Sequence, residues 1–213
     1  MSATNGIPAV HARRKPGWVA GVLLVCASLF GWYFARGTWA TTNPTYPTKS
    51  EDGVISHLVL NAEGRREIHT AVVIPVSVET AWGILSNYKE WERLFKTVHE
   101  RKPTEPLPGN RHHVVSDVQT PMGVLQLDFV VTHEPTDNGG YRATWDAPTK
   151  ELPTNRGSIQ ITPLGPDNML LVYVVEKQYR RYPQFLVYNA LYDHQADIVA
   201  TLRARMLEFA KEK

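Results

Sequence analysis

The pattern of hydrophobic and polar positions is most regular in the last thirty or so residues, from Pro183 to Lys213. Apolar side chains recur there at spacings of three and four, which stacks them on one face of an α-helix: Phe185, Tyr188, Tyr192, Val199, Leu202, Met206 and Phe209. Pro183 suits the first turn, because the amide that proline lacks would be unpaired there. The pattern predicts a helix of roughly 28 residues, about 42 Å long. So long a helix fits a small domain only if other elements wrap around it.

The apolar face of this predicted helix has two chemically different parts. Its first half carries Phe185, Tyr188 and Tyr192, with Gln195 one turn further on, and its second half is aliphatic and thioether. Aromatic rings with hydroxyl tips and one amide are suited to lining a cavity for a mostly apolar ligand. The other interpretation is a plain core face, which the pattern alone favours.

Short alternating runs separated by turn signals precede the helix and predict strands. These runs are residues 54–60, 65–74, 98–102, 111–119, 124–133, 141–145, 155–162 and 169–179. Residues 77–95 interrupt them with two short helices, the first capped by Ser77. The turn Asp137-Asn138-Gly139-Gly140 is a strong hairpin signal, and Pro103 is expected to end the third run. Successive strands joined by hairpins indicate an antiparallel sheet, and hence an α+β fold.

The N-terminal part of the chain has a different composition. Residues 17–35 contain no charged side chain, and Arg13, Arg14 and Lys15 precede them. This run is long enough to cross a bilayer as a helix, and the basic residues before it favour a cytoplasmic N-terminus. We therefore expect a cytoplasmic tail (1–16), a transmembrane anchor (17–36), a linker (37–52) and a ligand-binding domain (53–213).

A cleaved signal peptide is the alternative interpretation of residues 17–36. Thr38-Trp39-Ala40 is a tolerable cleavage site, although the apolar run is longer than usual for a signal peptide. With an anchor the domain is membrane-bound and extracytoplasmic, which means periplasmic in a Gram-negative cell. With cleavage it is secreted.

Charge and residue types exclude several classes of function. A net charge of +2, with no basic run among aromatics, gives no reason to expect nucleic acid as a partner. The one cysteine, Cys26, excludes an intrachain disulfide and a cysteine-based zinc site. The eight histidines form no metal-binding motif, and no phosphate loop, nucleophile elbow or dinucleotide fingerprint occurs. No metal and no cofactor are therefore expected.

Two segments resemble the START-like superfamily, also called SRPBCC or helix-grip. The first segment is residues 74–95, IPVSVETAWGILSNYKEWERLF. It is similar to the family's motif W-x-x-L-x-x-Y-x-x-W/P-x-x-x-F, which follows a strand, and the matching residues are Trp82, Leu85, Tyr88, Trp91 and Phe95. Residues 180–191, RRYPQFLVYNAL, are similar to the start of the last helix in polyketide cyclase/dehydrase-like and coenzyme-Q-binding members, with Phe185 where a Trp is common. The resemblance covers about residues 54–212, and this fold hosts carriers, sensors and enzymes.

The resemblance implies a curved antiparallel sheet gripping the long helix, with an apolar cavity between them. Candidate ligand-binding residues are the aromatic side chains expected near that cavity and one amide: Trp82, Trp91, Phe95, Phe129, Tyr141, Trp145, Tyr173, Phe185, Tyr188, Tyr192 and Gln195. The implied function is binding or carriage of a lipid, sterol-like or quinone-like molecule.

Two other functions remain open. A cyclase/dehydrase-type enzyme requires an ionisable residue facing inward on a central strand, but residues 169–179 are expected to place Tyr and Val there. Alternation puts Asp128 on the solvent face, and a structural role is favoured for Asp117 as well. A non-binding interaction module with a filled core is the third interpretation, and a cavity too small for a drug-sized molecule would favour it.

Overall fold

A computed structural model of the protein describes Gly31 and residues 38–212. The predicted membrane segment 17–36 lies outside these residues, apart from Gly31. Over the described part of the chain, no helix combines the length and the apolar character needed to cross a bilayer.

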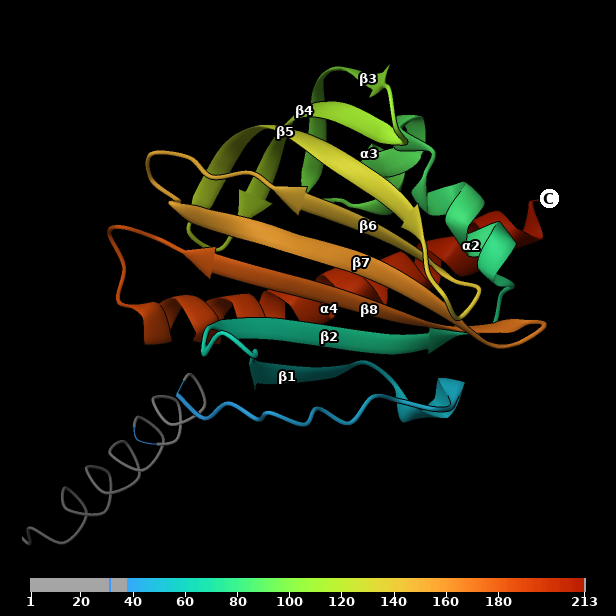
Figure 1. Ribbon diagram of the computed structural model, residues 1–213, viewed down its shortest axis with the longest axis horizontal. Helices are drawn as coiled ribbons and strands as arrows, with labels where there is room; N and C mark the ends of the chain where they lie inside the picture. Colours follow the sequence, from blue (N-terminus) through green and yellow to red (C-terminus); the bar gives the residue numbers. More distant parts are fainter. Residues whose placement is uncertain (1–30, 32–37, 213) are drawn as a thin grey trace, which may run out of the picture.

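One antiparallel sheet of eight strands forms the body of the domain (Figure 1). Its strands are β1 (Ile55–Leu60), β2 (Arg66–Ile74), β3 (Val98–Leu107), β4 (Arg111–Thr120), β5 (Gly123–Pro135), β6 (Tyr141–Asp146), β7 (Thr154–Gly165) and β8 (Asn168–Gln178). Their order is β1-β2-β8-β7-β6-β5-β4-β3. The first hairpin therefore joins the last strand, and β3 and β1 form the two edges. The antiparallel prediction is confirmed.

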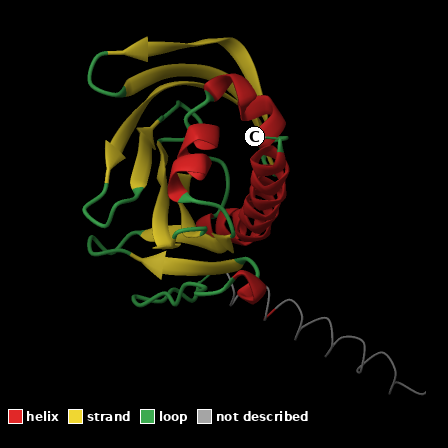
Figure 2. Ribbon diagram, turned by 90° about the vertical axis from the view of Figure 1, so that its right-hand side faces the viewer, coloured by secondary structure: helices red, strands yellow, loops and turns green. Residues whose placement is uncertain are grey.

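The sheet curves around its helices (Figure 2). The C-terminal helix α4 spans Gln184–Lys211, which is 28 residues, as the apolar period predicts. It packs against β1, β2 and β8, whereas α2 (Val78–Leu85) contacts β7 and α3 (Trp91–Leu94) contacts β3. Two short 3-10 turns, Ser50–Asp52 and Tyr88–Glu90, complete the elements. The long helix thus covers one half of the concave face and the short helices cover the other.

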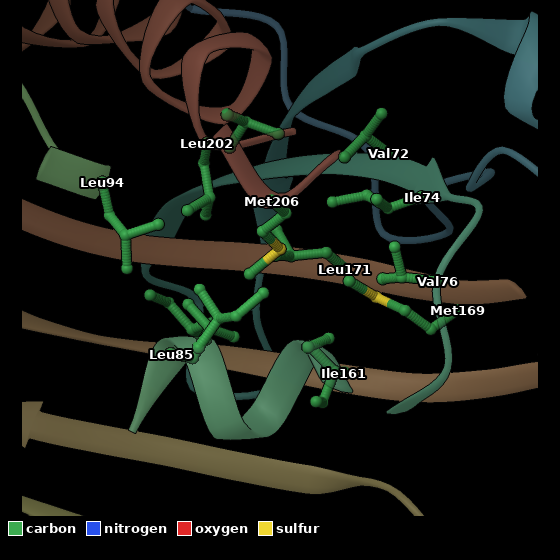
Figure 3. Packing of buried hydrophobic residues seen from close by; sticks show 14 of the residues in the cluster. Val72, Ile74, Val76, Leu85, Leu94, Ile161, Met169, Leu171, Leu202 and Met206 are labelled. Atoms are coloured by element: carbon green, nitrogen blue, oxygen red, sulfur yellow. The ribbon is translucent and has the colours of Figure 1, made fainter. Parts of the chain in front are cut away.

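The main core lies between α4, α2 and the central strands (Figure 3). Ile74 of β2, Leu171 of β8 and Met206 of α4 are all fully buried in it. Strand alternation explains their direction, because every second residue of a strand faces the same side. On β8 this inward set is Met169, Leu171, Tyr173, Val175 and Lys177.

The corner between the two short helices is fixed by local hydrogen bonds. Ser77 caps α2 as predicted, since its Oγ accepts a hydrogen bond from the Thr80 amide at 3.2 Å. The Trp91 indole donates to the Leu85 carbonyl at 2.8 Å and so closes the corner. α3 is thereby held over the sheet.

The predicted end of the third strand at Pro103 is wrong. β3 continues through Pro103 and Pro106 to Leu107, with register shifts between Glu100 and Lys102 and between Lys102 and Glu105. β3 lies at the edge of the sheet, where a proline loses no partner on its open side. The sequence alone does not say which strand is an edge.

The residues that precede β1 contact the domain on the side of the sheet where β1 forms the edge. Thr41 pairs in parallel with Val59, and Tyr46 bonds through its hydroxyl to Nδ1 of His69 at 2.6 Å. Arg203 of α4 donates to the Ser50 hydroxyl at 2.7 Å. These residues of the predicted linker are therefore attached to the domain, while the division of the chain at 52/53 stays a prediction.

Candidate functional site

A cavity of about 80 Å³ lies on the concave face between α3 and the sheet. Five of the predicted ligand-binding residues line it: Trp91, Phe95, Phe129, Trp145 and Tyr173. They come from α3 or its end and from three strands, so the fold brings together side chains spread over more than eighty positions. Whether they contact a ligand stays a prediction.

Seven further residues complete the wall. Val98, Val118, Leu127 and Ile159 are apolar, and Ser116, Asn155 and Lys177 are polar. None of these seven is among the predicted site residues, which are mainly aromatic. The alternation of each strand relative to a known inward residue is the signal that would identify most of them.

Lys177 is the feature of this wall that contradicts an expectation. β8 was expected to present only Tyr and Val inward, yet Lys177 lies on the same face as Tyr173 and lines the cavity with it. Burial lowers the pKa of its ammonium to about 8. That expectation is wrong, because Lys177 has the same phase as Tyr173 on the strand and so faces inward with it.

The positive charge of Lys177 also acts on the titration of His194 in α4. Burial lowers the pKa of the His194 imidazole, and the positive charge of Lys177 lowers it further. Desolvation disfavours the charged form of each group, and the positive charge of Lys177 adds to this effect at His194. His194 itself lines a groove between the α3–β3 connection and α4, not the cavity.

Trp82 and Tyr141, also predicted site residues, lie outside this cavity. Their rings stack at 4.8 Å between centroids and line a separate depression of about 180 Å³ together with His112 and His133. The His133 pKa falls to about 4, because the ring is buried and lies beside His112. This region is an aromatic cluster next to the cavity.

The four predicted residues of α4 also lie outside the cavity lining. Tyr188 donates to the Arg66 carbonyl at 3.0 Å, and the Tyr192 hydroxyl donates to the Ser56 carbonyl. Gln195 accepts from Thr70 Oγ1 at 3.4 Å, and Phe185 is half-buried in the first turn. In this structure the polar tips of α4 hold the helix to β1 and β2, because α4 covers that half of the sheet.

The two carboxylates considered for catalysis have partners on the outer face. Asp128 bonds His113 Nε2 at 2.7 Å, and Asp117 lies 3.6 Å from Arg101 Nε. Neither lines the cavity. The preference for a structural role is therefore supported at both positions.

No family model and no curated sequence matches. A STAR-related lipid transfer protein from Xanthomonas axonopodis has a TM-score of 0.60 at 15% identity, covering 74% of this chain and 96% of its own. Human STARD10 has a TM-score of 0.65 at 14% identity, covering 80% of this chain and 75% of its own. Zhui aromatase/cyclase from Streptomyces sp. R1128 has a TM-score of 0.53 at 12% identity, covering 68% and 94%.

The protein has the START-like fold. The resemblance seen in residues 74–95 and 180–191 is therefore confirmed at the level of the fold. At these identities the likeness establishes the fold alone, so the function must be argued from the site.

A larger groove, of about 590 Å³, lies on the outer face of the START-like sheet. Its wall contains ion-paired side chains, including Arg156 with Glu176 at 2.7 Å and His69 with Glu67 at 3.0 Å. Such a surface is satisfied by its own charges and by water. The smaller cavity, with its mainly apolar wall, is the better candidate site for a hydrophobic ligand.

Phe95 separates the cavity from a surface groove. It lines the cavity and also the groove of about 170 Å³ between the α3–β3 connection and α4. Leu94 and Ile198 line that groove but not the cavity. Phe95 is the side chain that the two spaces share, so it is the candidate gate between them.

Proposed function

We propose that this protein is a membrane-anchored, extracytoplasmic binding or carrier protein for a hydrophobic ligand. The ligand, a lipid, sterol-like or quinone-like molecule, is held on the concave face of the sheet. The observation that carries the proposal is the mainly apolar cavity between α3 and the sheet. Burial of apolar ligand surface there contributes about 25 cal/mol per Å².

The polar groups of the cavity support binding over simple packing. Ser116, Asn155, Tyr173 and Lys177 sit within an otherwise apolar wall. A few convergent polar groups in an apolar cavity are typical of sites that orient an amphipathic ligand. A core that served only stability would gain more from apolar side chains at these positions.

The cavity volume is the observation that favours the interaction-module alternative. About 80 Å³ is small beside the roughly 300–1,000 Å³ of sites for drug-sized ligands. A long-chain ligand therefore requires Phe95 to move and open the adjoining groove. A protein whose cavity stays closed would fit the non-binding module instead.

The proposed anchor places the domain beside the bilayer. Three residues separate the segment 17–36 from Ala40, which packs against a cluster containing Leu152, Tyr179 and Val187. The exposed apolar residues Tyr182 and Leu186 belong to the neighbouring start of α4. A tether at this end keeps the domain close to membrane lipids and raises its effective concentration there.

The experiment is native mass spectrometry of the full chain released from nonionic detergent micelles, followed by organic extraction of anything bound. Stoichiometric lipid or quinone supports the carrier function and gives the ligand class. Protein that carries nothing and takes up no added lipid contradicts it. A protease-protection assay in spheroplasts tests the extracytoplasmic location separately: full protection of the domain contradicts that location.

A further inference from the structure

Lys177 is one of four polar residues that line the cavity, and Asn155 is its partner in the β7–β8 ladder. Tyr173 lies four residues before Lys177 on the same face of β8, Ser116 comes from β4 and Asn155 from β7. The aromatic wall, with Trp91, lies on the α3 side. The site therefore presents a cationic group and hydroxyl donors next to an apolar space, which is the arrangement that an acidic amphiphile matches.

The charge of Lys177 is not balanced within the described part of the protein. No carboxylate there pairs with its ammonium, and burial is the cause of its altered titration. Glu176 faces the other side of the sheet, 2.7 Å from Arg156 and 3.3 Å from Arg65. A half-buried, desolvated cation without a counter-charge is costly, and an anion brought by a ligand removes that cost.

The groups around Lys177 reinforce this need for an anion. From α4, His194 has its pKa lowered by burial and by Lys177 and raised by Asp197, so at pH 7 it is neutral and brings no counter-charge. Tyr173 keeps its proton at neutral pH, because burial raises the pKa of its hydroxyl to about 12, and it can donate a hydrogen bond. Ser116 and Asn155 are neutral. The site thus offers donors and a cation and no acceptor carboxylate.

We propose that Lys177 binds the carboxylate of an acidic amphiphile, of the long-chain fatty acid type, whose apolar chain lies against Trp91, Phe129 and Trp145. This inference rests on the proposed binding function. A single cation in a narrow space suits a compact monoanionic head group better than a bulky phosphodiester. An ammonium–carboxylate hydrogen bond is charge-assisted and therefore strong.

The test uses the full chain in nonionic micelles and two probes of equal chain length, palmitic acid and hexadecanol. Native mass spectrometry at pH 7 measures the bound fraction of each probe in the wild type, in Lys177→Met and in Lys150→Met. Lys150 is exposed and serves as the matched control. The wild type and K150M are expected to prefer the acid at least tenfold, and K177M is expected to lose that preference.

The pH dependence gives a second readout. The preference of the wild type for the acid is expected to fall at least tenfold between pH 7 and pH 9.5, as Lys177 loses its proton. Tyr173 stays protonated and His194 stays neutral in this window. In Lys177→Arg the preference is expected to persist at pH 9.5, because the guanidinium stays protonated.

The possible failures are distinguishable. If hexadecanol binds and palmitic acid binds no better, or if K177M keeps the preference, the role of Lys177 is wrong while the binding function stands. If K177R loses its preference at high pH as the wild type does, another group titrates and the assignment is wrong. If neither probe binds the wild type, the proposed function fails and this inference fails with it.

Discussion

The Tyr88 hydroxyl and Nε2 of His133 lie 2.6 Å apart in a hydrogen bond that joins the turn before α3 to strand β5. The two rings also stack at 5.7 Å between centroids, and His112 lies 4.6 Å from His133. Burial raises the pKa of the Tyr88 hydroxyl, so both partners are neutral near pH 7. This bond anchors the helical corner that forms one wall of the cavity.

The first prediction concerns acid stability at His133. The pKa of His133 is about 4 in the folded state and near 6.5 in the unfolded chain, so the unfolded chain binds more protons between these values. The free energy of unfolding therefore falls as the pH falls from 6.5 to 4. The expected loss is about 1–2 kcal/mol, because solvent screening at the partly exposed ring reduces the effect. His133→Gln should flatten this dependence in urea unfolding followed by circular dichroism.

His99→Gln is the matched control for that measurement, because His99 is exposed on β3. Its pH profile should equal that of the wild type. If H133Q loses as much stability between pH 6.5 and 4 as the wild type does, His133 does not carry the acid sensitivity.

The second prediction concerns the stability cost of Lys177. Its pKa is about 8 in the folded state and 10.5 in the unfolded chain. The cost of burying the charge is fully present below pH 8 and disappears as the pH rises to 10.5. Lys177→Met should therefore stabilise the protein at pH 7 by about 2–3 kcal/mol, or about 5–10 °C in melting temperature.

The same gain should shrink to less than a third at pH 10.5, measured by thermal unfolding with circular dichroism. Lys150→Met, at an exposed position, should leave the melting temperature within a degree or two at both values. A K177M protein that melts below the wild type at pH 7 would contradict the buried, uncompensated charge.

The third prediction tests Phe95 as the gate. Phe95→Ala should join the cavity to the groove between α3 and α4 and speed the uptake of a fluorescent lipid at least tenfold in stopped-flow measurements. It should also cost about 3–5 kcal/mol of stability, since Phe95 is buried.

Leu94→Ala provides the control for the gate. Leu94 is fully buried and lines the groove but not the cavity. Its loss costs a comparable 2–5 kcal/mol and leaves the wall intact. Equal acceleration in both variants would mean that general loosening, rather than an opened wall, controls uptake.

The fourth prediction concerns Gly157, where β7 passes close to Trp145. An added Cβ would lie 2.3 Å from the Val174 carbonyl oxygen and 2.5 Å from Cζ2 of Trp145. Gly157→Ala should destabilise the protein by about 2–3 kcal/mol and displace the indole that lines the cavity. Urea unfolding and tryptophan fluorescence measure the two effects.

Gly165→Ala, at the end of the same strand, is the comparison. A Cβ there has no atom within 4 Å, so stability and fluorescence should stay near the wild-type values. A tolerated G157A would show that the sheet and Trp145 can shift without cost at this point.

Local sequence patterns are sufficient to predict the periodic elements of this protein. A period of 3.6 over residues 185–209 can bury one face only as a helix, and alternation with hairpin turns can form only an antiparallel sheet. The motif from Trp82 to Phe95 then indicates the START-like fold. Five of the aromatic residues predicted along the whole chain to bind a ligand do meet at one cavity. Local chemistry was enough for these points, because periodicity and turn signals are properties of neighbouring residues.

The tertiary structure alone decided which face and which helix form the cavity. The phase of β8 relative to the core turns Lys177 inward, and the packing of α4 on β1, β2 and β8 gives Tyr188 and Tyr192 structural partners. The edge position of β3 likewise permits Pro103 and Pro106 within a strand. These outcomes depend on which strands become neighbours, and no local pattern fixes that choice.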